Sequence, residues 1–122
     1  MLYYSTNNRS VKVSLQEAVV NGLAPDRGLY MPDHIPQLPA AFFENIVNKS
    51  LPEIASVVAD AFFADDINQN SLDSIVTDTL NFEIPLKEVE KGIYVLELFH
   101  GPTFAFKDVG ARFMARMLSF FV

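Results

Sequence analysis

The sequence of 122 residues contains no cysteine and no tryptophan. The absence of cysteine excludes disulfide bonds, thiolate catalysis and cysteine-ligated metals, and it fits a reducing compartment. Basic residues are also few, because nine Lys and Arg stand against fifteen Asp and Glu, for a net charge of −6. The basic residues form no run, so the chain lacks the electrostatic footprint of a nucleic-acid-binding protein.

Targeting and membrane segments are missing as well. The first residues, MLYYST, have neither the basic region nor the apolar core of a signal peptide. No apolar run approaches the roughly 18 residues that a bilayer span needs. We therefore expect a cytoplasmic protein without a membrane partner. Half of the residues are apolar, which is enough for a folded core.

Two helix starts carry capping boxes. Ser14 is followed three positions later by Glu17, and Ser50 by Glu53, the spacing at which a serine caps a helix and a glutamate returns the bond. The first helix is expected to end at Gly22. The second has apolar residues at helical spacing from Ile54 onwards.

The segment 25–39 holds four of the seven prolines, so we expect an ordered, packed loop there. Helices are predicted over 40–48 and again around Leu72 to Leu80. After Pro85 the period changes, and two strands are predicted over 86–89 and 93–99, joined by a turn that ends in Gly92.

A final helix is predicted after the break at Gly101-Pro102, with Thr103 as its cap. Its apolar positions are Phe106, Val109, Phe113, Met114, Met117 and Phe120. This helix runs to Val122 without a cap, so we expect the chain to be the amino-terminal part of a longer protein. The predicted fold class is α+β: a helical amino-terminal domain with short strands and a β-hairpin, leading into the first helix of an α/β enzyme.

Lys107 is the most distinctive candidate for chemistry. It follows a strand and a Gly-Pro turn, the kind of junction at which α/β enzymes build sites. Phe104 and Phe106 flank it at a helix N-terminus, and both surroundings disfavour a charged amine. A neutral lysine is a nucleophile toward aldehydes. A surface lysine whose stem lies over the phenylalanines is the alternative, and spacing alone favours it.

The other polar residues allow plainer interpretations. His100 could be a general base or a metal ligand, but a histidine that is hydrogen-bonded within the turn is the better interpretation. Asp65, Asp66, Asp73 and Asp78 have no metal-binding or catalytic spacing, so we expect a solvated face and no metal site. Asp108 could complement the helix dipole, pair with Lys107 or orient a substrate.

Two segments resemble the threonine synthase family. Residues 97–108, ELFHGPTFAFKD, closely resemble its pyridoxal-phosphate attachment region, and residues 21–32, NGLAPDRGLYMP, resemble its amino-terminal signature. The opening Tyr-x-Ser-Thr-Asn also fits. The two motifs occur in order, and the resemblance covers nearly the whole chain. Arg27 stands where the family is expected to have a glycine or another small residue, and Phe104 where leucine is common.

The resemblance implies a lyase of threonine biosynthesis that converts O-phospho-L-homoserine and water to L-threonine and phosphate. It implies that Lys107 is the catalytic residue and holds pyridoxal 5'-phosphate as a Schiff base. Thr103 and Asp108 are the expected substrate contacts. Residues 1–82 are then the family's amino-terminal domain, and residues 83–122 the hairpin, the cofactor-lysine loop and the first helix of the cofactor region, which is incomplete.

The glycine-rich phosphate loop of the family lies outside these residues, so we expect the 122-residue chain to be inactive by itself and to lack the cofactor. Two alternatives stay open: a non-catalytic interaction module on the same fold, and another pyridoxal-phosphate-dependent lyase. Self-association through Phe120, Phe121 and Val122 is also expected if these side chains are bare.

Overall fold

Three short strands form one antiparallel sheet near the amino terminus. The computed structural model describes residues 1–122, and its first sheet has the strand order β2-β1-β3. The strands are β1 (Tyr3–Ser5), β2 (Lys12–Val13) and β3 (Tyr30–Pro32). The sequence from Leu2 to Thr6 is compatible with a short strand, and β1 lies there, whereas β2 was not predicted and β3 lies within the segment predicted as a loop. The proline-rich segment is therefore ordered, as expected, but part of it is a strand.

Helix α1 (Leu15–Asn21) begins and ends where the sequence predicts. The Ser14 hydroxyl accepts a hydrogen bond from the Glu17 backbone N–H at 3.1 Å. Gly22 ends the helix with φ +70, a conformation that costs glycine little. Leu15, Ala18 and Val19 are buried on one face of the helix, as the helical spacing predicts.

The helix predicted over 40–48 is in fact broken. It consists of α2 (Ala40–Glu44) and a 3₁₀ turn η1 (Ile46–Asn48). The Asn45 side-chain amide donates to the Ala41 carbonyl at 2.8 Å, and so takes an acceptor that the next helical N–H would use. This local competition explains the break.

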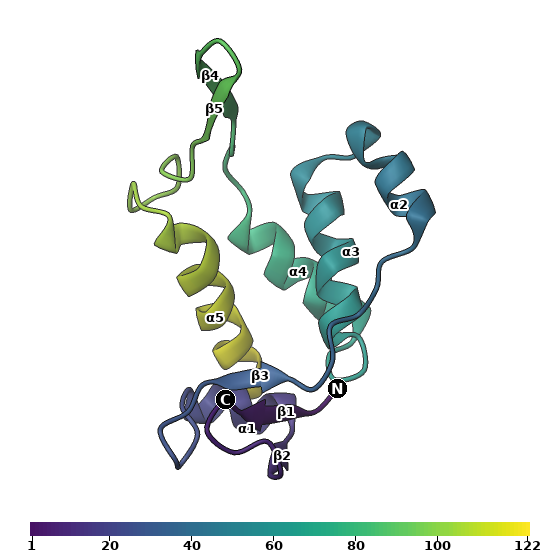
Figure 1. Ribbon diagram of the computed structural model, residues 1–122, viewed down its shortest axis with the longest axis vertical. Helices are drawn as coiled ribbons and strands as arrows, with labels where there is room; N and C mark the ends of the chain where they lie inside the picture. Colours follow the sequence, from purple (N-terminus) through teal and green to yellow (C-terminus); the bar gives the residue numbers. More distant parts are fainter.

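Helices α3 (Leu51–Phe63), α4 (Gln69–Thr79) and α5 (Lys107–Phe121) pack beside one another above the small sheet (Figure 1). The capping box at Ser50 and Glu53 is complete, and Asn68 caps α4. The core joins these helices to β1 and α1. Its buried members are Tyr3, Leu15, Ala18, Val19, Ala59, Ile67, Leu72, Ile75, Val76 and Met117.

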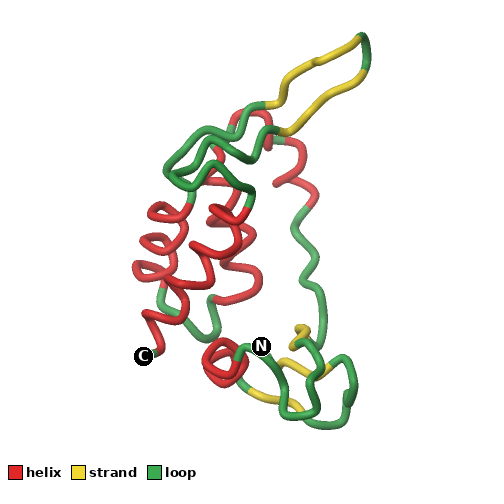
Figure 2. Tube along the Cα trace, turned by 90° about the vertical axis from the view of Figure 1, so that its left-hand side faces the viewer, coloured by secondary structure: helices red, strands yellow, loops and turns green.

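The hairpin of β4 (Leu86–Glu90) and β5 (Ile93–Leu96) stands away from the helices (Figure 2). Every residue of both strands is exposed. Gly92 makes the turn with φ +79, as expected, but the second strand ends at Leu96 and not at Phe99. None of the helices has both the length and the apolar content that a membrane crossing requires. The predicted α+β class is confirmed.

Candidate functional site

The segment between β5 and α5, residues 97–106, is here called the lysine loop. It leaves the hairpin at Glu97, whose backbone N–H donates to the Pro85 carbonyl at 3.0 Å. His100 lies at hydrogen-bond distance from Glu97, with 2.7 Å between Nε2 and Oε2, and its ring stacks on Phe99 with the centroids 4.7 Å apart. His100 is thus hydrogen-bonded within the turn, as the plainer interpretation predicts.

The centre of the lysine loop is a tight turn. The Phe104 N–H donates to the Gly101 carbonyl at 3.1 Å, and Phe104 has φ +56, in the left-handed region that non-glycine residues rarely adopt. A turn that holds such a residue stores strain, and other contacts must hold it in place.

Thr103 does not cap the final helix, so this prediction is wrong. Helix α5 begins at Lys107 with Phe106 as its N-cap, and no side chain caps it. The Thr103 N–H donates instead to Asp108 Oδ2 at 2.8 Å. Because the carboxylate turns back to the loop, the helix starts three residues later than a cap at Thr103 would place it. The Thr103 hydroxyl stays at an exposed position.

Lys107 occupies the first turn of α5 and is exposed. The predicted aromatic enclosure is absent from these residues, since Phe104 is 81% exposed and Phe106 67%. Asp108 does not pair with Lys107, which takes part in none of the ion pairs. The amine is therefore open to a ligand, and nothing in this chain removes it from water.

Asp108, by contrast, is only 2% exposed. Its position conflicts with a direct substrate contact unless the loop opens. Thr103 and Asp108 were both expected at the substrate site. The structure brings the two residues together through the hydrogen bond between them.

Arg112 fixes the site to the rest of the molecule, a role the sequence analysis missed. It lies one turn beyond Asp108 on α5 and donates to the carbonyl oxygens of Asp78 and Thr79 at 2.7 and 3.0 Å. It also donates to Asn81 Oδ1 at 3.2 Å. These acceptors lie at the carboxyl end of α4, where carbonyls are left unpaired and cations are favoured. The only signal in the sequence was an arginine on the predicted last helix.

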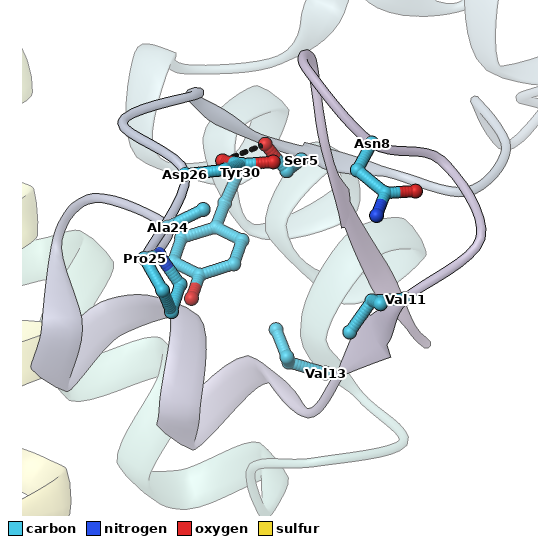
Figure 3. A pocket seen from close by; sticks show the side chains of 8 residues that line it. All are labelled: Ser5, Asn8, Val11, Val13, Ala24, Pro25, Asp26 and Tyr30. Atoms are coloured by element: carbon cyan, nitrogen blue, oxygen red, sulfur yellow. Dashed lines mark hydrogen bonds between the residues drawn. The ribbon is translucent and has the colours of Figure 1, made fainter.

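The second motif, residues 21–32, folds around Asp26. The Asp26 carboxylate accepts from the Ser5 hydroxyl at 2.6 Å and from the Gly28 N–H at 2.9 Å. These hydrogen bonds, that of Ser5 first, lower the pKa of Asp26 below its usual range. Arg27 has φ +66, which explains why a glycine suits that position. Figure 3 shows the pocket of about 200 Å³ beside this turn, lined in part by Ser5, Asp26 and Tyr30.

The two motifs do not come together in space. The lysine loop and the turn around Asp26 lie at opposite ends of α5 (Figure 1). A helix of 15 residues spans roughly 20 Å. The amino-terminal motif therefore supports the fold at one end of α5, and Lys107 stands at the other.

The predicted acidic face has structural partners in the fold. Asp65 and Asp66 lie 3.5 and 3.2 Å from the amino-terminal nitrogen of Met1, and Asp78 pairs with Arg116 at 3.4 Å. Gln69 donates to Asp73 at 3.2 Å. No group of three or more His, Cys, Asp or Glu side chains is arranged to hold a metal ion.

Comparison with known proteins gives a consistent result. The family described as "Threonine synthase N terminus" matches residues 2–80. Threonine synthase of Schizosaccharomyces pombe is 42% identical over 98% of this chain and 24% of its own length, and that of Haemophilus influenzae is 40% identical over 98% and 28%.

Solved structures agree with the sequence matches. Threonine synthase from Escherichia coli superposes with a TM-score of 0.92 at 35% identity, over 99% of this chain and 28% of that one. A pyridoxal-phosphate-bound threonine synthase from Brucella melitensis gives 0.91 at 35% identity, over 99% and 27%. The chain thus spans about a quarter of the length of the relatives it matches.

Proposed function

The chain belongs to the threonine synthase family, and we propose that it is the amino-terminal part of an enzyme that converts O-phospho-L-homoserine and water to L-threonine and phosphate. The observation that carries the proposal is the exposed Lys107 amine at the start of α5, directly after the lysine loop. Its side chain fits covalent attachment of an aldehyde cofactor, because it is accessible and not engaged in an ion pair.

Pyridoxal 5'-phosphate, when bound, would supply an electron sink for carbanionic chemistry. The residue of this chain that would hold it is Lys107. When its amine is free, Lys107 Nζ would accept a proton and return it, as a general base and acid at the reacting carbons. The Thr103 hydroxyl, which is exposed and two residues beyond Gly101, is the proposed substrate contact. Its N–H is already used by Asp108.

The rest of the site is proposed to lie in other parts of the full-length protein, outside residues 1–122. Residues 1–82 are the proposed amino-terminal domain, and residues 83–122 the beginning of the cofactor region. The hairpin and the three phenylalanines of the lysine loop, Phe99, Phe104 and Phe106, expose apolar side chains. Two-stranded hairpins are marginal unless they are covered, so this surface suits coverage by further elements of the full enzyme. The absence of cysteine fits a cytoplasmic enzyme.

The test uses the full-length protein that contains these residues. We expect borohydride reduction of the cofactor-loaded protein to leave the label on Lys107, and Lys107→Ala to abolish phosphate release from O-phospho-L-homoserine. The matched control is Lys91→Ala, at the exposed hairpin turn, which we expect to remain active. A label on another lysine, or full activity of Lys107→Ala, would contradict the proposal.

The 122-residue chain alone is proposed to be inactive. One lysine, with the neighbouring aromatics exposed, cannot hold the cofactor specifically. Pyridoxal phosphate and borohydride should label Lys107 no more than Lys87 and Lys91, which are also exposed. Selective and tight labelling of Lys107 in this chain would show that the cofactor site needs nothing further.

A non-catalytic interaction module is the second candidate, and the exposed apolar hairpin is the observation that favours it. The reading frame beyond Val122 separates the two: a continuing α/β enzyme with a glycine-rich loop supports the synthase or a related lyase, and a stop codon supports the module. Self-association through the carboxyl end remains a prediction. Phe121 packs against the core, so Phe120 and Val122 are left for it, and light scattering over a concentration series would detect it.

A further inference from the structure

The buried carboxylate of Asp108 has a task that the proposed chemistry does not use. Charged side chains are rarely buried this far unless polar partners satisfy them. The partner here is the lysine loop: Asp108 Oδ2 accepts the Thr103 N–H at 2.8 Å. Asp108 belongs to none of the ion pairs, so this contact is with the loop backbone and not with a cation.

Gly101 also lies against the Asp108 carboxylate. A Cβ added at Gly101 would lie 2.6 Å from both Cβ and Oδ2 of Asp108, closer than any side chain tolerates. The backbone at Gly101 therefore packs directly on the carboxylate. Gly101 and Thr103 are two of the four residues of the turn that the Phe104 N–H closes on the Gly101 carbonyl. One side chain thus contacts the first and the third residue of the turn.

The same side chain also sets the start of α5. No side chain caps this helix, and Asp108 is its second residue. Consecutive helical residues point about 100° apart around the helix axis. With Asp108 fixed inward against the loop, Lys107 leaves the helix in a different direction, toward solvent.

We propose that Asp108 is a positioning residue: its buried carboxylate fixes the turn at 101–104 and thereby the setting of Lys107 on the first turn of α5. The inference rests on the proposed role of Lys107 as the cofactor lysine. It assigns Asp108 a role through the loop in place of the substrate contact expected from the resemblance. The contacts of Asp108 with Gly101 and Thr103 are here called the clamp. This clamp would maintain the strained φ of +56 at Phe104.

The first test is amide hydrogen exchange, measured by NMR on the 122-residue chain. Asp108→Ala should accelerate exchange at Thr103 by roughly 10- to 100-fold, because a hydrogen bond to a charged acceptor is lost. Exchange at Val76 in the core should stay within about threefold, since only local opening changes. Asp108→Asn keeps an oxygen acceptor, so it should retain most of the protection. Unchanged exchange at Thr103, or equal acceleration at Thr103 and Val76, would overturn the proposal.

A second variant reaches the same contact from the loop. Gly101→Ala should accelerate Thr103 exchange as Asp108→Ala does, because the new Cβ expels the carboxylate. Gly110→Ala is the matched control, since a Cβ there meets nothing within 4 Å. If Gly101→Ala behaves as Gly110→Ala does, the clamp is refuted, even where Asp108→Ala fails to fold.

The third measurement follows Lys107 itself in the full-length protein. The measured quantity is the rate at which pyridoxal phosphate forms a borohydride-reducible adduct with Lys107. This rate should fall at least about tenfold in Asp108→Ala, because correct placement of a reacting group carries large rate factors. It should stay within about threefold of the wild-type rate in Asp108→Asn. A wild-type rate in Asp108→Ala would overturn the positioning role. A raised KM in Asp108→Asn with unchanged Thr103 exchange would assign Asp108 to the substrate instead.

These outcomes are separable from a failure of the proposed function. If the cofactor labels a different lysine while the exchange pattern holds, Lys107 is not the cofactor lysine and the clamp on the loop still stands. If Lys107 is labelled and the exchange pattern fails, the proposed function stands without the clamp.

Discussion

Residues 1–82 differ from the hairpin and its lysine loop, residues 83–106, in how their leucines are buried. In the first, Leu72 is 0% exposed and packs with residues from β1, α1, α3 and α5. In the second, Leu96 is 55% exposed and neighbours no buried residue of the core. Similar side chains thus form a core in one region and a bare surface in the other.

Helix α5 joins the two regions and shows the contrast within one element. Its carboxyl half places Met117 in the core, whereas its first residue, Lys107, is exposed beside the lysine loop. The packed region therefore acts as a support that holds one end of α5. The difference shows that α5 is anchored in the core through its carboxyl half, while the end that carries Lys107 is exposed.

The largest expected effect comes from the core. Leu72→Ala should lower the free energy of unfolding by about 3–5 kcal/mol, because it leaves a cavity at a fully buried site. Leu96→Ala on the hairpin should cost less than about 1 kcal/mol, since the side chain is already half in water. Denaturant unfolding of both variants measures the contrast, and equal losses would mean that the two regions share one core.

Arg112→Ala tests how the base holds α5. The variant loses the bonds to the Asp78 and Thr79 carbonyls, which we expect to cost about 1–2 kcal/mol because the donor is charged but half-buried. Arg116→Ala is the matched control on the same helix. Its exposed pair with Asp78 should contribute less than about 0.5 kcal/mol. Thermal unfolding would refute this anchoring role of Arg112 if Arg116→Ala lowered the stability more than Arg112→Ala.

Arg27→Gly should stabilise the amino-terminal unit by about 1 kcal/mol. The residue has φ +66, where a Cβ is unfavourable and glycine is not. Arg27→Ala keeps the Cβ and removes the guanidinium, so it should show no such gain. If both variants stabilise the protein equally, the charge of Arg27 and not its backbone is the cause.

Tyr3→Phe should have the smallest effect near neutral pH, within about 1 kcal/mol, because the buried hydroxyl has no hydrogen-bond partner to lose. Burial first, and then the charges of Asp66 and Asp33, raise the pKa of Tyr3 to about 12.

The raised pKa of Tyr3 should make the free energy of unfolding fall at alkaline pH. The folded pKa of Tyr3 is higher than the unfolded value of 10.0, so its contribution is complete below pH 10 and is lost as pH rises toward 12. Unfolding measured across this range should show a shallower loss in Tyr3→Phe than in Tyr4→Phe. Identical alkaline limbs in the two variants would contradict the assignment.

Local signals predicted much of this fold. The caps at Ser14 and Ser50, the stop at Gly22 and the hairpin turn at Gly92 depend on residues close in sequence, and each is where the pattern places it. Strand β2 escaped prediction because two residues are too few to show alternation, and β3 because it lies in the proline-rich segment, where a loop was expected.

The candidate site was predicted less completely. The role that the resemblance implies for Lys107 stays a prediction. The position of Thr103 was not predicted, because it depends on a carboxylate five residues away that turns back from the helix. The exposure of Phe104 and Phe106 depends on which elements cover them, and no pattern within a loop carries that information. The exposure of these two side chains therefore depends on long-range packing, which the local sequence pattern does not predict.

The contrast between the packed core and the exposed hairpin is tested most directly by amide protection in the two regions of the 122-residue chain. Hydrogen exchange reports the free energy of local opening for each amide. We expect the amides of α4, around Leu72 and Val76, to exchange at least roughly 100-fold more slowly than those of β4 and β5, because only the former lie in a packed core. Equal protection in the helix and the hairpin would contradict it.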